Sequence, residues 1–236
     1  MANYKTHKNF GISITVLILI SIIVSSLVLK ENIEMLKINI QTIIVSLVMG
    51  IIGSIMPDID LKNTIPYKIF KNFLYLLAIL ILFLINMRYS SEAIFIDINI
   101  NNLNITQIQI LIEVLFTFLI IYIFIKWFDN NTIHRGLMHS IPFAIFTSIL
   151  NIQFFSLINE EMEVFRLNTF VIGFLFFAGY ITHLILDEYY SIDFYNKKIK
   201  KSFGSALKLI DKNNLFGTFL IYSYIILYTY IKIYQE

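Results

Sequence analysis

The segment from His134 to Ser140 reads His-Arg-Gly-Leu-Met-His-Ser and lies between two long apolar runs. It combines two imidazoles with one guanidinium. Imidazole is the commonest metal ligand in proteins and the one side chain that ordinarily titrates near neutral pH. A short basic connector between two membrane helices explains the same residues equally well, so the positions of the remaining histidines decide between the two interpretations.

Two further groups of polar residues have spacings that suit metal binding. His183 and Asp187 lie four residues apart, so both side chains point to one face of a helix and offer a nitrogen and an oxygen to one ion. Asp58 and Asp60 follow Pro57, which prevents the preceding helix from simply continuing. We expect an extended turn there, from which both carboxylates reach inward. Taken singly, each group could also be structural, as an ion pair or as helix caps.

The composition predicts the elements that position these residues. The chain has 236 residues, of which 58% are hydrophobic and 14% charged, whereas a soluble domain carries roughly 25% charged residues. This is the composition of a polytopic membrane protein. There are no cysteines, so a metal must be held by His, Asp and Glu.

Seven apolar segments approach the ~20 residues that a helix needs to cross a bilayer. They are Phe10–Leu29, Ile38–Met56, Phe73–Met87, Ile108–Phe128, Ile141–Ile158, Asn168–Leu186 and Leu215–Tyr234. The third is the shortest. The chain is therefore predicted to be an all-α bundle of about seven transmembrane helices, forming a single membrane-embedded domain over residues 1–236.

With seven spans, all four histidines and the acidic residues near them fall on the same side of the membrane. The acidic residues are Asp58, Asp60, Asp187 and Glu188. Of the 18 Lys and Arg residues, 13 fall on the side of the N-terminus. Because cytoplasmic loops carry the excess of Lys and Arg, we expect the N-terminus and the polar residues to be cytoplasmic.

The joint pattern predicts a metal site at the cytoplasmic boundary. The predicted ligands are His7, Asp58, Asp60, His134, His139, His183 and Asp187. This mixture favours Zn²⁺, with Mn²⁺ or iron as alternatives, and the number of ligands suggests two ions. Arg135 is assigned to a substrate anion, because its planar fork matches phosphate or carboxylate. Glu188 is assigned to a base or to an acceptor that orients a ligand.

Three local features add expectations about packing and partners. Ser46, Gly50 and Ser54 recur four apart, the spacing at which membrane helices approach closely. Ser140 is placed to cap the fifth span, with a proline in the first helical turn. The loop Lys197–Lys212 is basic, which predicts contact with anionic lipid, and its stretch Ser202–Ile210 could form a short amphipathic helix.

At these residues the chain resembles the YdjM-like family of inner-membrane-associated, LexA-binding proteins regarded as metal-dependent hydrolases. The matching pieces, in chain order, are His7, Pro57–Asp60, His134–Ser140, His183–Glu188, Ser191–Asp193 and Lys200–Lys208. The resemblance implies a bacterial multi-pass inner-membrane protein with hydrolase activity. The LexA link belongs to particular members and is not carried over.

Two functions follow as hypotheses. The first is a membrane-bound, metal-dependent hydrolase that acts on a phosphoester, such as a lipid headgroup, at the cytoplasmic face. The second is a non-enzymatic scaffold or regulatory protein whose metal staples the helix ends together. A transporter is disfavoured, because Glu113 is the only formal charge well inside a predicted span.

Overall fold

The computed structural model describes residues 3–28, 38–92, 99–100, 103–133, 135–162, 166–193, 198–200 and 203–235. The helices are α1 (Tyr4–Val28), α2 (Ile40–Ile55), α3 (Ile65–Glu92), α4 (Ile105–Asn131), α5 (Ile141–Glu161), α6 (Thr169–Tyr189) and α7 (Leu215–Gln235). Within the described residues, seven helices are long and apolar enough to cross a membrane. The predicted all-α architecture with seven spans is confirmed.

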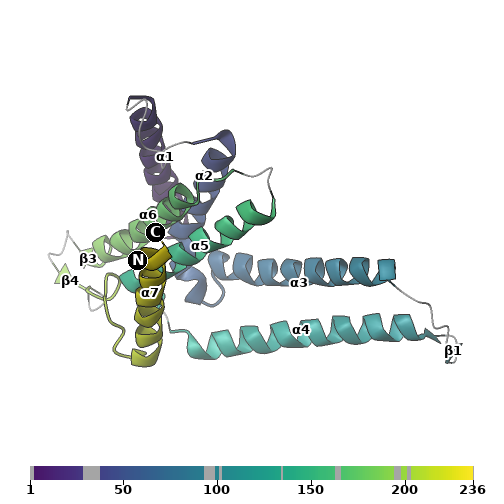
Figure 1. Cartoon of the computed structure of the whole chain (residues 1–236). Helices are drawn as coiled ribbons and strands as arrows, with labels where there is room; N and C mark the ends of the chain where they lie inside the picture. Colours follow the sequence, from purple (N-terminus) through teal and green to yellow (C-terminus); the bar gives the residue numbers. More distant parts are fainter. Residues whose placement is uncertain are drawn as a thin grey trace. The chain divides into compact units, whose positions relative to one another are not determined.

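The chain divides into two compact units. The first unit comprises Met1–Asp60 and Ile133–Glu236, and the second comprises Leu61–Thr132. In the first unit α6 is the central helix: it packs against α1, α2 and α5, while α7 packs against α5 (Figure 1). Every described residue of the predicted site belongs to this first unit.

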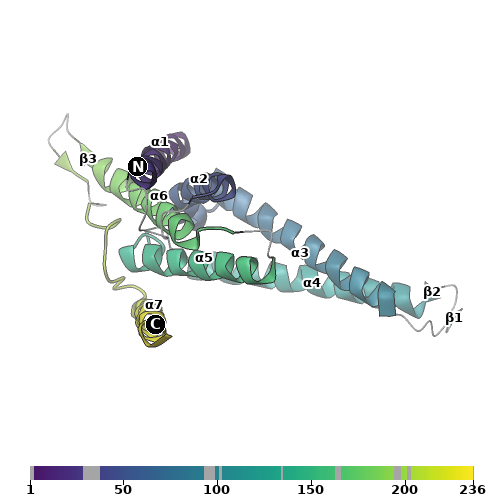
Figure 2. The ribbon, with the colours of Figure 1, turned by 45° about the horizontal axis from the view of Figure 1, so that its top comes forward.

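The second unit is a hairpin of α3 and α4, which run side by side in both views (Figures 1 and 2). Between them the short strands β1 (Asn99–Ile100) and β2 (Leu103–Asn104) pair antiparallel. Near the other end of the hairpin, the Tyr67 hydroxyl lies 2.9 and 3.0 Å from the two carboxylate oxygens of Asp129 and donates to that carboxylate.

The contact between α2 and α6 explains how two segments distant in sequence reach one site. Ser46, Gly50 and Ser54 are all buried on α2, as their spacing predicted. A Cβ atom added to Gly179 on α6 would overlap the carbonyl oxygen of Gly50. The two backbones therefore nearly touch, and this close approach fixes the C-terminal end of α2 beside α6.

Capping side chains set where several helices begin. Ser140 caps α5 by accepting from the Phe143 N–H at 3.4 Å, and a proline lies in the first turn, as expected. Asn39 caps α2 by accepting from the Thr42 N–H at 2.7 Å. These short polar residues satisfy donors that the helix itself leaves unpaired.

Two sequence expectations about elements are wrong. The third helix begins at Ile65 rather than Phe73, because Thr64 and Pro66 supply a helix start and the two lysines that interrupt the apolar run are accommodated in the helix. The expected amphipathic helix at Ser202–Ile210 does not form across residues 203–210, which are irregular. Their backbone instead pairs with the segment before α5, through a parallel bridge between Ser140 and Lys208.

Candidate metal centre

The sequence predicted that His7 precedes the first span. In the structure it lies within α1. The helix begins early because the Asn3 side chain accepts from the Thr6 N–H at 2.9 Å and so caps it. The His7 side chain is consequently held within a regular helical turn, and it is buried, with a relative exposure of 1%.

Asp58 and Asp60 lie in a 3₁₀ turn, η2 (Met56–Asp60), instead of the expected extended turn. The Met56 N–H still donates to the Ile52 carbonyl, so α2 tightens into 3₁₀ geometry rather than breaking at Pro57. Both aspartates are buried at the end of this helix.

His183 and Asp187 are fully buried on one face of α6. The Nδ1 atom of His183 lies 2.8 Å from the carbonyl oxygen of Ser54 on α2. A carbonyl can only accept, so we assign the proton to Nδ1 and a lone pair to Nε2. This contact orients the ring in the way that a ligating histidine is usually oriented by its second nitrogen.

The segment Arg135–Ser140, hereafter the His loop, supplies His139 between α4 and α5. The His139 side chain is fully buried. Its backbone N–H donates to the Gly136 carbonyl at 3.0 Å, and the buried Tyr180 hydroxyl donates to the Met138 carbonyl. His134, also predicted as a ligand, lies outside the described residues.

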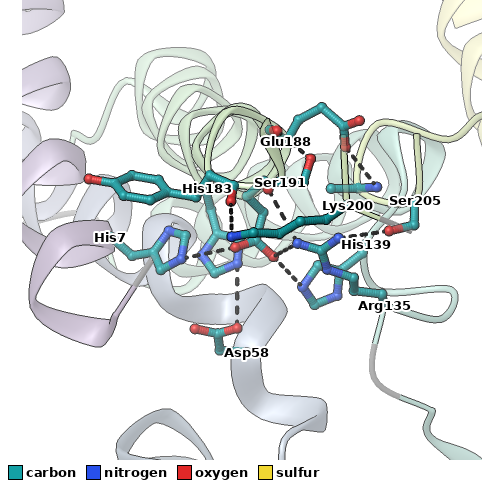
Figure 3. Close-up of polar contacts among 12 residues, drawn as sticks. His7, Asp58, Arg135, His139, His183, Glu188, Ser191, Lys200 and Ser205 are labelled. Atoms are coloured by element: carbon teal, nitrogen blue, oxygen red, sulfur yellow. Dashed lines mark hydrogen bonds and ion pairs between the residues drawn. The ribbon is translucent and has the colours of Figure 1, made fainter. Parts of the chain in front are cut away.

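Asp187 is the point where the side chains of α1, α6 and the His loop meet. Its Oδ1 atom lies 3.4 Å from His7 Nε2, and its Oδ2 atom lies 3.7 Å from His139 Nε2. The rings of His7 and His183 stack with their centroids 3.8 Å apart. Figure 3 shows His7, His139 and His183 gathered in one place, with Asp58 beside them.

The aspartates of η2 complete the arrangement from the other side. Asp58 Oδ1 lies 3.5 Å from His183 Nε2, and Asp60 Oδ2 lies 3.4 Å from His139 Nδ1. The structure therefore brings together all six of the predicted metal ligands that it describes.

Among the described residues, two overlapping groups have ligand atoms within 4.8 Å of one another. They are His7, His183 and Asp187, and Asp58, His139 and His183. Because Nδ1 of His183 is used by Ser54, only Nε2 can bind an ion, and it can bind one. The two groups therefore share one ligand atom and would hold a single ion between them, whereas the two ions suggested by the sequence stay a prediction.

The donor atoms fit a metal ion better than they fit hydrogen bonds among themselves. Within the described part of the chain, both ring nitrogens of His7 and Nε2 of His183 are buried without a hydrogen-bond partner, and the buried Asp187 carboxylate makes ion-pair contacts with His7, Arg135 and His139. The separations of 3.4 to 3.7 Å between His and Asp atoms exceed the length of a charge-assisted hydrogen bond. A tetrahedral ion with bonds of about 2.0–2.2 Å holds its ligand atoms about 3.3–3.6 Å apart.

Arg135 was assigned from sequence to a substrate anion. In the structure its guanidinium lies against the Asp187 carboxylate. Its Nη2 atom is 3.2 Å from Asp187 Oδ2 and donates to the Asp187 carbonyl at 3.2 Å. Its Nη1 atom donates to Ser205 Oγ at 2.8 Å. The guanidinium is therefore engaged on two sides, and a phosphate would have to exchange for one of these contacts.

Glu188, assigned from sequence to a base or to an acceptor that orients a ligand, binds backbone in this structure. Its carboxylate accepts hydrogen bonds from the N–H groups of Gly204 and Ala206. Among the described residues it belongs to neither ligand group. Glu188 thus anchors the loop that follows α6.

Sequence reasoning missed three residues that organise the centre: Tyr180, Ser205 and Lys208. Tyr180 could have been noticed, because it lies three residues before His183 in an otherwise apolar span, where a buried hydroxyl needs a partner. Ser205 and Lys208 lie in the basic loop, which was assigned to lipid. Lys208 instead donates to the Arg135 carbonyl at 2.7 Å and pairs with Asp211 at 3.1 Å.

Comparison with known proteins places the chain in a family. Neither a curated protein nor a solved structure matches it. The family described as YdjM inner membrane protein matches residues 1–235, which is almost the whole chain. The chain therefore belongs to the YdjM inner membrane protein family and is a multi-pass inner-membrane protein.

Proposed function

We propose that this protein is a metal-dependent hydrolase that cleaves a phosphoester, such as a lipid headgroup, at the cytoplasmic face of the inner membrane. The observation that carries the proposal is the convergence of three histidines and three aspartates from α1, η2, α6 and the His loop into one buried cluster. By the parity of seven spans, these four segments would lie on one side of the membrane, near the depth of the lipid headgroups.

The proposed ligands are the six described residues of the cluster, together with His134. They are His7, Asp58, Asp60, His139, His183 and Asp187. Zn²⁺ suits this mixture best, with Mn²⁺ or iron as alternatives. A divalent ion held by these residues would supply a Lewis acid for a phosphoryl oxygen and a water of lowered pKa.

The chain's own residues supply the rest of the chemistry. The Asp58 side chain is 10% exposed, whereas the side chains of His183 and Asp187 are fully buried, so substrate approaches from the Asp58 side. Arg135 would bind the substrate phosphate by exchanging its contact with Ser205, and its two-pronged donor matches that geometry.

The burial of the cluster also favours a second candidate, a structural metal site in a scaffold protein. A closed site of this kind would join the ends of α1, α2 and α6 to the His loop without any turnover. The two functions differ in coordination, because a catalytic ion keeps one position for water or substrate and a structural ion is surrounded by protein ligands.

Two further parts of the proposal concern orientation and lipid. The excess of basic residues on the side of the N-terminus supports a cytoplasmic N-terminus. Contact with anionic lipid through Lys197–Lys212 would rest on the lysines other than Lys208, which faces the protein. Lys197 and Lys201 lie outside the described residues.

The test is a screen of phosphoesters in mixed micelles with purified, zinc-loaded protein. We expect hydrolysis by the wild type and its loss in His183→Ala. Arg135→Lys keeps the charge but loses the planar fork, so turnover should fall by about 10–100-fold, or ~1.4–2.7 kcal/mol of transition-state stabilisation. Glu160→Ala, at the exposed end of α5, is the control and should match the wild type. Absence of hydrolysis across the screen, with an ion fully coordinated by protein groups, would favour the scaffold.

A further inference from the structure

The segment Phe203–Asp211, hereafter the strap, runs beside the His loop and is tied to it by backbone. The Ile141 N–H donates to the Lys208 carbonyl at 3.1 Å, next to the parallel bridge between Ser140 and Lys208. Leu207 packs against the core cluster that contains Tyr180. The strap is therefore part of the folded first unit.

The strap contacts Arg135 through both its side chain and its backbone. Ser205 Oγ accepts from Arg135 Nη1 at 2.8 Å, and Lys208 Nζ donates to the Arg135 carbonyl at 2.7 Å. Asp211, also buried, holds the Lys208 ammonium at 3.1 Å. These contacts fix the position of the guanidinium as well as the direction of the chain that carries it.

Arg135 adopts an unusual backbone conformation that needs such support. Its φ angle is 57°, in the left-handed region that residues other than glycine rarely adopt. A strained residue of this kind persists where its surroundings over-determine it, and such residues cluster at functional sites. Here the conformation aims the Arg135 side chain, which is 8% exposed, at the fully buried Asp187.

Glu188 fastens the beginning of the strap. It directly follows Asp187 on α6, and its two carboxylate oxygens accept from the N–H groups of Gly204 and Ala206. The same turn of α6 therefore carries the carboxylate that Arg135 contacts and the carboxylate that holds the strap. This coupling gives Glu188 a role that does not require it to reach the cluster.

We propose that Glu188, Ser205 and Lys208 are positioning residues that hold Arg135 against Asp187 as a built-in counter-cation of the metal centre. The inference rests on the proposed metal centre. It adds that the Arg135 guanidinium offsets part of the negative charge of the cluster. Because the buried cluster contains three carboxylates, a fixed guanidinium beside it reduces the attraction for a divalent ion. It also compensates the buried charge when no ion is bound.

The test is a double-mutant cycle on Zn²⁺ affinity, measured by chelator competition with the purified full-length protein. Arg135→Met removes the repelling cation, so Zn²⁺ should bind about tenfold more tightly. Lys208→Met and Glu188→Ala release Arg135 and should tighten binding by about threefold or more. In the Arg135→Met background, Lys208→Met and Glu188→Ala should have almost no further effect, because they act through Arg135.

Lys200→Met is the matched control, since it removes the same charge from the same loop, but Lys200 Nζ donates to the Tyr190 carbonyl. Its affinity should equal that of the wild type. The inference fails if Lys208→Met and Glu188→Ala leave Zn²⁺ affinity unchanged, if their effects add in full to that of Arg135→Met, or if Lys200→Met shifts the affinity equally. If Glu188→Ala does not fold, Ser205→Ala replaces it in the cycle. It removes a single hydroxyl that holds Arg135, so it should also tighten Zn²⁺ binding in the wild-type background and have almost no effect beside Arg135→Met.

The cycle needs no turnover, so its result is separable from that of the proposed function. Non-additive effects on Zn²⁺ affinity without any hydrolysis would support the counter-cation and contradict the proposed hydrolase activity. Hydrolysis together with additive effects of the substitutions on Zn²⁺ affinity would support the enzyme and overturn the counter-cation. A wild type that binds no Zn²⁺, Mn²⁺ or iron would overturn the inference together with the metal centre.

Discussion

Replacing Gly179 by alanine tests whether the close approach of α2 and α6 sets the geometry of the cluster. The added Cβ would lie 3.0 Å from the Gly50 carbonyl carbon and 3.1 Å from the Ser54 amide nitrogen, in addition to overlapping the Gly50 oxygen. These atoms are backbone and cannot rotate away. Since carbon atoms ordinarily rest about 3.5–4.0 Å apart, the helices must separate by about 1 Å.

The separation has two consequences of calculable size. Overpacking of this kind typically costs 1–3 kcal/mol of stability, and we expect about 3 kcal/mol, because backbone meets backbone. The 3.5 Å distance between His183 Nε2 and Asp58 Oδ1 spans the same interface and would widen with it. Metal affinity should then fall about 10- to 100-fold, as it does when groups that orient ligands are disturbed.

The assay is Zn²⁺ affinity and thermal unfolding of Gly179→Ala in detergent. Gly217→Ala on α7 is the control, because the nearest atoms to a Cβ there are the ends of the Asn214 and Leu137 side chains, which can move. It should retain wild-type affinity. If Gly179→Ala unfolds at a lower temperature yet binds Zn²⁺ as tightly as the wild type, the helix contact does not position the ligands and the reasoning is refuted.

Other predictions follow from single contacts and from the span count. Tyr180→Phe leaves a buried carbonyl of the His loop without its donor, so it should lower stability by about 1–3 kcal/mol and weaken metal binding; unchanged melting and affinity would contradict this. Tyr67→Phe removes the hydrogen bond to Asp129 in the second unit and should lower stability by about 1 kcal/mol while leaving metal affinity unchanged. Reporter fusions at Lys197 and Glu236 should report opposite sides of the membrane, cytoplasmic for the first, and a shared side would refute seven spans.

The sequence predicted the number of spans because apolar length is a direct physical requirement for crossing a bilayer. It also predicted that these histidines and aspartates would gather in one group, since parity in a multi-pass chain assigns every helix end to a side. The start of α3 was missed because Lys68 and Lys71 interrupt the apolar run, although a helix tolerates them near its end.

What the sequence could not show at the site are the tertiary contacts that hold each side chain. Nothing in the order of residues showed that Arg135 contacts Asp187 or that Glu188 binds the strap backbone. Lys208 was assigned to lipid by its charge, yet the bridge between Ser140 and Lys208 turns it inward. Such contacts join segments tens of residues apart and leave no periodic signal in the sequence.

The most direct test of the metal centre is elemental analysis of the purified full-length protein beside His183→Ala. His183 belongs to both ligand groups, and its removal leaves the apolar spans intact. The wild type should retain about one transition-metal ion per chain, and His183→Ala should lose it while still inserting in the membrane. Equal metal content in the two proteins, or none in a wild type incubated with Zn²⁺, Mn²⁺ and iron, would contradict the centre described here.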